Sequence, residues 1–103
     1  MKPAVLSGLA AAALCLSAGV AQAQVDPLQV RSWAAACAAC HGTNGHAEQG
    51  NEPLAGANKD EMLKKLMDFK SGAKPATLMH QLAKGYTDEQ LAAISAWFAA
   101  QKK

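Results

Sequence analysis

The chain has 103 residues, with 10 lysines and arginines against 8 acids and a formal net charge of +2 at pH 7. This near-neutral balance gives no strong overall attraction to polyanions, so binding to nucleic acid is not expected. Aromatic residues make up 5% of the chain and alanine is abundant, so a domain this small needs something bulky to complete its core.

The first 23 residues have the pattern of a cleaved export signal. Lys2 precedes an apolar run over 4–20, and residues 21–23 give the small-x-small pattern that a signal peptidase recognises. The run is short and rich in alanine and glycine, so no stable membrane insertion is expected. We therefore predict a cleaved signal peptide at 1–23, one domain at 24–103 and a periplasmic location.

A first helix is expected at the start of the domain. Asp26 can cap it, and Pro27 fits the first helical position, where no backbone donor is needed. The residues that follow at helical spacing on one side are Val30, Trp33, Ala34 and Cys37. This apolar side would bring the Cys37 thiol to the core.

The middle of the chain is predicted to be a loop followed by a second helix. Several glycines mark the loop over 42–56. Either Asn58 or Asp60 can then start a helix that runs to about Ser71, where Gly72 ends it.

Two further helices are expected near the C-terminus. A short helical piece over 76–84 is followed by a break at Gly85 and Tyr86. Thr87 with Gln90 then forms a capping box for a last helix over 88–101. The apolar stripe of this last helix consists of Leu91, Ile94 and Phe98, with Trp97 at its border. Valine and isoleucine are scarce after the leader, so strands are not expected and the domain is predicted to be all-α.

Residues 37–41 read C-x-x-C-H, which is the attachment motif of a c-type haem. Two thiols at this spacing can each bond to one vinyl group, and the imidazole that follows is then held beneath the iron. We therefore predict one covalent haem c, with Cys37 and Cys40 as thioethers and His41 as the proximal iron ligand. The haem would also supply the apolar volume that the core lacks.

Three other uses of the cysteines fit the sequence less well. A thioredoxin-like dithiol needs strands that this chain lacks. A structural zinc site needs four ligands, whereas Cys37, Cys40, His41 and His46 are crowded together without a second pair. A disulfide across two residues closes too small a loop to stabilise a fold.

A methionine is the expected second axial ligand, because a neutral thioether raises the reduction potential relative to a second histidine. Met79 follows a Gly and Pro turn and is the favoured ligand. Met62 and Met67 fall inside the second helix, where thioethers more often fill gaps in a core. His80 is an alternative to Met79, since neighbouring helical residues do not face the same way and both cannot reach the iron.

Together these features resemble class I cytochrome c. The resemblance rests on C-x-x-C-H at the end of a first helix, a proline-containing loop, a methionine and an amphipathic last helix. It implies three to five helices wrapped around one haem, with the first and last helices crossing. It also implies that the backbone oxygen of Pro53 accepts a hydrogen bond from His41 and that Leu54 packs on the haem edge.

Residues 69–72, 75–79 and 83–89 are more narrowly similar to the cytochrome subunit of flavocytochrome c sulfide dehydrogenase and to small bacterial monohaem cytochromes. The resemblance implies periplasmic electron transfer, with a redox partner protein that can be a sulfide-oxidising flavoprotein subunit. The alternative is a free soluble shuttle to a terminal oxidase or reductase, and a haem enzyme with an open distal site is the third possibility. The lysines near Met79 that we expect to steer an acidic partner are Lys70, Lys74 and Lys84.

Overall fold

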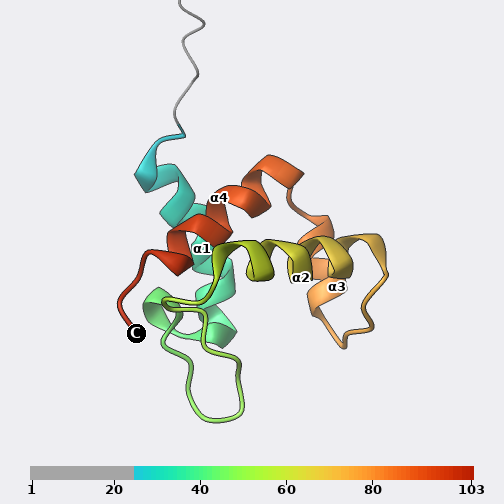
Figure 1. Cartoon of the computed structure of the whole chain (residues 1–103), viewed down its shortest axis with the longest axis horizontal. Coiled ribbons are helices and arrows are strands. Elements are labelled where there is room, and N and C mark those ends of the chain that lie inside the picture. The colour runs from blue at the N-terminus through green and yellow to red at the C-terminus, as the bar shows by residue number, and fades with distance from the viewer. Residues whose placement is uncertain (1–24) are drawn as a thin grey trace, which may run out of the picture.

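The computed structural model describes residues 25–103, which form four α-helices and one short 3-10 helix (Figure 1). Residues 25–103 contain no strand, so the all-α prediction is confirmed for this part of the chain. Within the same residues, no helix has both the length and the apolar character needed to cross a membrane. The predicted signal peptide at 1–23 lies outside the described residues.

Helix α1 spans Pro27–His41 and therefore ends with the C-x-x-C-H motif. Its cap is the predicted one, because the side chain of Asp26 accepts a hydrogen bond from the backbone N–H of Leu28 at 2.9 Å. The helix stops at Gly42, whose φ of 84° is readily adopted only by glycine. This stop turns the chain back toward the core immediately after His41.

The loop between α1 and α2 begins with a 3-10 helix, η1 (Thr43–Gly45), which the sequence did not predict. The carbonyl oxygen of Gly45 accepts hydrogen bonds from the N–H groups of Leu54 and Ala55 at 2.9 and 3.1 Å. The N–H of Gly56 donates to the carbonyl of Phe98 in the last helix at 3.0 Å. The base of the loop is thus closed on itself and attached to the C-terminal end of the fold.

Helix α2 spans Lys59–Ser71 and begins at the first of its two predicted starts, because the side chain of Asn58 accepts from the N–H of Glu61 at 3.0 Å. Helix α3 spans Met79–Lys84 and so begins three residues later than expected. The delay has a local reason, since Leu78 has a φ of −137° and lies outside the helical region.

Helix α4 spans Asp88–Ala99 and ends two residues before the expected end. The predicted capping box is present: the N–H of Gln90 donates to the Thr87 hydroxyl at 3.1 Å, and the N–H of Thr87 donates to the Gln90 side chain at 2.8 Å. The residues of the predicted apolar stripe are all buried: Leu91, Ile94 and Phe98.

The core lies where α1, α2 and α4 meet, and α1 and α4 pack against each other as the resemblance implied (Figure 1). Its buried centre consists of Ala34, Met62, Ile94 and Phe98. The Phe98 ring is fully buried and meets the edge of Trp97 at 4.9 Å between ring centroids. This buried centre is small, and side chains leave two cavities between the helices.

Candidate haem-binding site

Two cavities of about 310 and 180 Å³ adjoin the C-x-x-C-H motif. The larger is of the size that proteins use for small-molecule and cofactor sites, roughly 300–1,000 Å³. The residues that line both cavities are Cys37, His41, Leu66, Met79 and Ile94. Side chains that line both cavities stand where the two adjoin, so His41 of α1 and Met79 of α3 share one boundary.

The orientation of His41 is set by a backbone carbonyl. Its Nδ1 lies 2.6 Å from the carbonyl oxygen of Glu52. Because a carbonyl oxygen only accepts, Nδ1 carries the hydrogen and donates, which leaves the lone pair of Nε2 available for a metal. A metal-binding histidine is held in just this way by a second hydrogen bond.

The predicted acceptor, the carbonyl of Pro53, is wrong by one residue. The residue before a proline is held extended, and successive carbonyls of an extended chain point to opposite sides. Only one of the two oxygens can therefore face the imidazole, and that oxygen belongs to Glu52.

Glu52 is connected to α2 as well. Its carboxylate receives a hydrogen bond from Lys65 Nζ at 2.7 Å, which lowers the pKa of the Glu52 carboxyl. Both side chains are largely exposed, so water screens this ion pair. The pair nevertheless connects the segment that supplies the acceptor of His41 to a neighbouring helix.

The two cysteines of the C-x-x-C-H motif are free thiols that both line the larger cavity. Cys37 is half-buried, and this burial raises the pKa of its thiol, while Cys40 is exposed. Within residues 25–103, no group of three or more His, Cys, Asp or Glu side chains could hold a metal ion.

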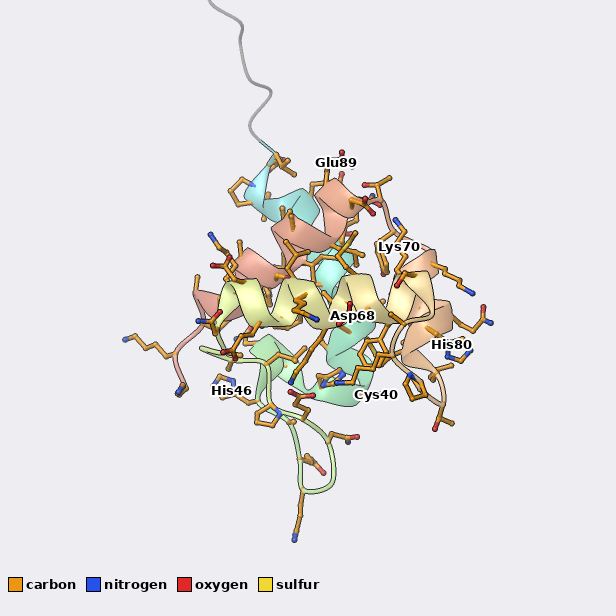
Figure 2. The ribbon with its side chains drawn as sticks, turned by 45° about the vertical axis from the view of Figure 1, so that its right-hand side comes forward. Cys40, His46, Asp68, Lys70, His80 and Glu89 are labelled. Carbon is orange, nitrogen blue, oxygen red and sulfur yellow. The ribbon has the colours of Figure 1, made fainter. Side chains whose placement is uncertain are left out.

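His46 is engaged away from the cysteines. Its Nε2 lies 2.7 Å from the carbonyl oxygen of Lys102, and its Nδ1 lies 3.2 Å from that of Thr43. In Figure 2 the ring of His46 lies on the left, well apart from Cys40. Its place is at the contact between the loop and the C-terminal segment.

Among the candidates for the second axial ligand, opposite His41, Met79 alone lines both cavities. Met62 is 7% exposed and belongs to the buried core, as predicted for a gap-filling thioether, although it also reaches the smaller cavity. Met67 and His80 line neither cavity, and Figure 2 shows His80 at the right-hand edge of the molecule. The structure therefore gives the bis-histidine alternative no support.

Two further residues complete the cavity walls. Leu54 lines the smaller cavity together with Phe98, which is compatible with the predicted contact to a haem edge. Tyr86 lines the larger cavity. Its hydroxyl donates a hydrogen bond to the carbonyl of Trp33 at 3.4 Å, and burial raises the pKa of this hydroxyl. Sequence reasoning treated Tyr86 only as part of a break between helices, and its position directly before a capping threonine was the available signal.

The three lysines near Met79 differ in their surroundings. Lys70 Nζ lies 2.7 Å from a carboxylate oxygen of Asp88, so its charge is paired and does not contribute to a free positive surface. Lys74 lies over the ring of Phe69 at 5.3 Å from the centroid. Lys84 is exposed at the end of α3 and has no ion-pair partner among residues 25–103. Steering of a partner by these three lysines stays a prediction, with the charge of Lys70 offset locally by Asp88.

A helical fold around an apolar double cavity, with C-x-x-C-H and a methionine on its walls, defines a class I cytochrome c. The family model described as cytochrome c matches residues 30–102. The chain belongs to the cytochrome c family, and membership implies a covalently attached haem c. The imidazole with a free Nε2, the thioether and the two thiols at one apolar space fit such a group.

Similar proteins come from several bacteria. The chain is 39% identical to cytochrome c4 of Pseudomonas aeruginosa, with 82% of this chain and 42% of that protein covered. It is 37% identical to the cytochrome subunit of sulfide dehydrogenase of Chlorobaculum tepidum, with 60% and 56% covered. It is also 37% identical to the thiosulfate dehydrogenase electron acceptor of Stutzerimonas stutzeri, with 88% and 44% covered. The chain thus spans about half the length of these relatives.

Proposed function

We propose that this protein is a periplasmic electron carrier that holds one haem c through Cys37 and Cys40, with the iron between His41 and Met79. One observation carries the proposal: His41 and Met79 come from different helices and stand together where two apolar cavities adjoin. The haem supplies a one-electron Fe(III)/Fe(II) couple when it is bound.

The two thiols provide the attachment. Each adds across one vinyl group, so that sulfur bonds to one vinyl carbon and the thiol hydrogen goes to the other.

The axial pair determines what the site does. His41 presents Nε2, and its hydrogen bond to the Glu52 carbonyl makes the imidazole a better donor to a metal. Met79 approaches from α3 as a neutral thioether, which favours a high potential. With both positions filled by protein ligands, no position is open for oxygen or peroxide, so the site suits a carrier better than an enzyme.

The surroundings favour fast electron transfer. Leu66 and Ile94 line both cavities, so apolar side chains face the space beside His41 and Met79. Most wall residues lie on helices, which limits how far the ligands move when the charge on the iron changes. A small rearrangement lowers the barrier for each electron transferred.

A second and narrower proposal concerns the partner. The names of two relatives refer to dehydrogenases of reduced sulfur compounds, one for sulfide and one for thiosulfate. These names favour a role in which the chain accepts electrons from such a dehydrogenase. In the more specific version of this proposal, the chain is the cytochrome subunit of a sulfide-oxidising flavoprotein. The alternative is a free shuttle that delivers electrons to a terminal oxidase or reductase.

One experiment tests both the electron-carrier proposal and the partner proposal. The protein is purified natively from its source, and its absorption spectrum is recorded before and after addition of sulfide, with dithionite as the reduction control. Reduced haem c bands with a bleaching flavin contribution support the flavoprotein complex. Haem bands that respond only to dithionite favour the shuttle, and a purified protein without covalent haem contradicts the electron-carrier proposal. N-terminal sequencing of the same material tests the predicted cleavage after residue 23.

A further inference from the structure

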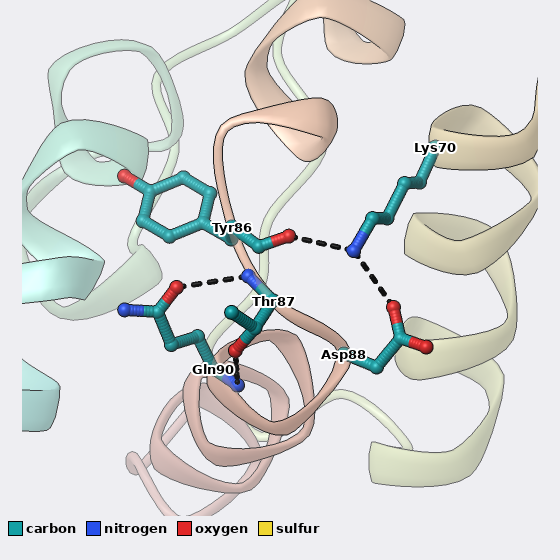
Figure 3. Close-up of polar contacts among 5 residues, drawn as sticks. All are labelled: Lys70, Tyr86, Thr87, Asp88 and Gln90. Atoms are coloured by element: carbon teal, nitrogen blue, oxygen red, sulfur yellow. Dashed lines mark hydrogen bonds and ion pairs between the residues drawn. The ribbon is translucent and has the colours of Figure 1, made fainter.

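The ammonium group of Lys70 connects α2 to the α3–α4 linker and to the start of α4. Lys70 lies in the last turn of α2, and its Nζ donates to the carbonyl oxygen of Tyr86 and to a carboxylate oxygen of Asp88, both at 2.7 Å (Figure 3). Tyr86 belongs to the short linker between α3 and α4, and Asp88 is the first residue of α4. One side chain therefore fixes the end of α2 to the linker and to the start of α4.

Tyr86 is held on its other sides as well. Its hydroxyl donates to the carbonyl of Trp33 in α1 at 3.4 Å, and its N–H donates to the carbonyl of Ala83 in α3 at 3.3 Å. The next residue, Thr87, begins the capping box of α4 (Figure 3). The linker at Tyr86 is thus the place where contacts from all four α-helices converge.

Two things position helix α3: its packing against α2 and its connection to this linker. The helix has six residues and no side-chain cap at its start, and a helix this short is not stable by itself in water. Residues 71–75 before it are exposed and contain the Gly72 and Pro75 turn, so they give little support. Helix α3 packs against α2, Ala83 is only 1% exposed, and the linker at Tyr86 connects α3 to α4.

We infer that Lys70 is a positioning residue for Met79: by holding the Tyr86 carbonyl, it keeps α3 where the Met79 thioether faces the space opposite His41. This inference rests on the proposed role of Met79 as an iron ligand. The hydrogen bond to the carbonyl is the more important of the two contacts, because Asp88 is largely exposed and water screens its charge. A hydrogen bond from a charged donor to a backbone oxygen is stronger than a neutral one.

The test replaces Lys70 by methionine in the haem-loaded protein, with Lys64→Met as the matched control. Lys64 lies on the same helix and pairs with Asp68 four residues away, so its loss removes the same charge without touching the linker. Two readouts are taken on the ferric protein: the thioether-to-iron charge-transfer absorption, and the apparent Kd of imidazole, which competes for the position opposite His41.

The apparent affinity for imidazole rises with the fraction of molecules in which Met79 is displaced. We expect Lys70→Met to tighten imidazole binding about fivefold, which corresponds to roughly 1 kcal/mol, and to weaken the charge-transfer absorption. Lys64→Met should leave both unchanged, and Lys70→Arg should restore most of the native behaviour, because a guanidinium can also donate to both oxygens.

Each outcome has a separate meaning. A wild-type protein without the thioether absorption overturns the proposed Met79 ligation itself. An intact absorption and an unchanged imidazole Kd in Lys70→Met overturn the positioning role alone, even if the variant unfolds at a lower temperature. If Lys70→Met does not load haem, Lys70→Gln is compared with Lys64→Gln in the same way, because the neutral amide removes the charged donor at each position without adding a thioether. A tighter Kd only in Lys70→Gln supports the inference, and equal values contradict it.

Discussion

The imidazole of His41 and the backbone carbonyl of Glu52 are joined by a hydrogen bond of 2.6 Å, while the side chain of the same Glu52 pairs with Lys65 of α2. The proximal side of the site is therefore held by a backbone acceptor whose segment is connected to a helix through an ion pair. The distal side follows the same design, since Lys70 of α2 holds the Tyr86 carbonyl. Helix α2 thus supports both walls without supplying either proposed ligand.

Replacement of Glu52 by glutamine should remove a pH-dependent part of the stability and keep the His41 acceptor. Because Lys65 lowers the pKa of Glu52 below 4.5, the ion pair stabilises the fold above that ordinary value and is lost as pH falls through the lowered folded value. Both groups are well exposed, so the expected loss near neutral pH is about 0.2–1 kcal/mol. Thermal unfolding of the wild type and of Glu52→Gln, from neutral pH to pH 3, measures this loss of stability. A stability difference between the two that does not shrink in acid contradicts the stabilising role of the ion pair.

Replacement of Met79 by histidine should lower the reduction potential, because a second imidazole stabilises the ferric iron relative to a thioether. Axial ligands tune haem potentials over roughly 0.8 V, and we expect a decrease on the order of 0.1 V or more. Met62→Leu is the control, since this buried thioether should fill space without binding iron and its exchange should cost less than about 1.5 kcal/mol. Potentiometric titration decides, and equal potentials in wild type and Met79→His would exclude Met79 as a ligand.

The parts of this fold that depend on neighbours in sequence were predictable. The helix caps at Asp26 and Thr87 use side chains within three residues of their acceptors or donors, and the stripe containing Ile94 follows helical spacing. The thiols of the C-x-x-C-H motif and His41 belong to one pentapeptide, so their proximity needs no tertiary information.

The parts that depend on backbone groups far apart in sequence were not predictable. A carbonyl has no side-chain signature, so nothing in the sequence distinguishes the oxygen of Glu52 from that of Pro53 as the acceptor of His41. The same holds for Lys70. From the sequence it is predicted to be a free surface cation, whereas in the structure its Nζ donates to the Tyr86 carbonyl and to Asp88. Loop conformation and helix docking decide these contacts.

Replacement of Gly45 by alanine should destabilise the protein more than the same change at Gly50. Both glycines have a positive φ, 82° and 99°, so both variants carry a conformational cost of roughly 1–2 kcal/mol. A Cβ at Gly45 would also lie 2.6 Å from the Ala55 nitrogen and 2.9 Å from the Phe98 ring, whereas at Gly50 nothing lies within 4 Å. The crowding should add about 1–3 kcal/mol. Denaturant unfolding measures the difference, and equal stabilities would show that the loop moves freely away from Phe98.

Reversal of the charge at Lys84 should slow electron transfer to a small anionic oxidant such as ferricyanide. The larger cavity is lined at α3 by Leu78 and Leu82, which are 53% and 38% exposed, and Lys84 ends the same helix. A positive charge beside this apolar surface raises the local concentration of an anion, and the effect extends about 30 Å at 0.01 M salt but only about 3 Å at 1 M.

Lys102→Glu is the control for Lys84→Glu, because it changes the net charge equally at the C-terminal segment, which lies at the opposite side of the view in Figure 1 from α3. In stopped-flow oxidation of the ferrous protein at low salt, Lys84→Glu should react about threefold more slowly than Lys102→Glu, and high salt should abolish the difference. A cationic oxidant should reverse the order. Equal slowing by both variants would mean that net charge alone controls the rate and that the α3 surface is not the site of electron exit.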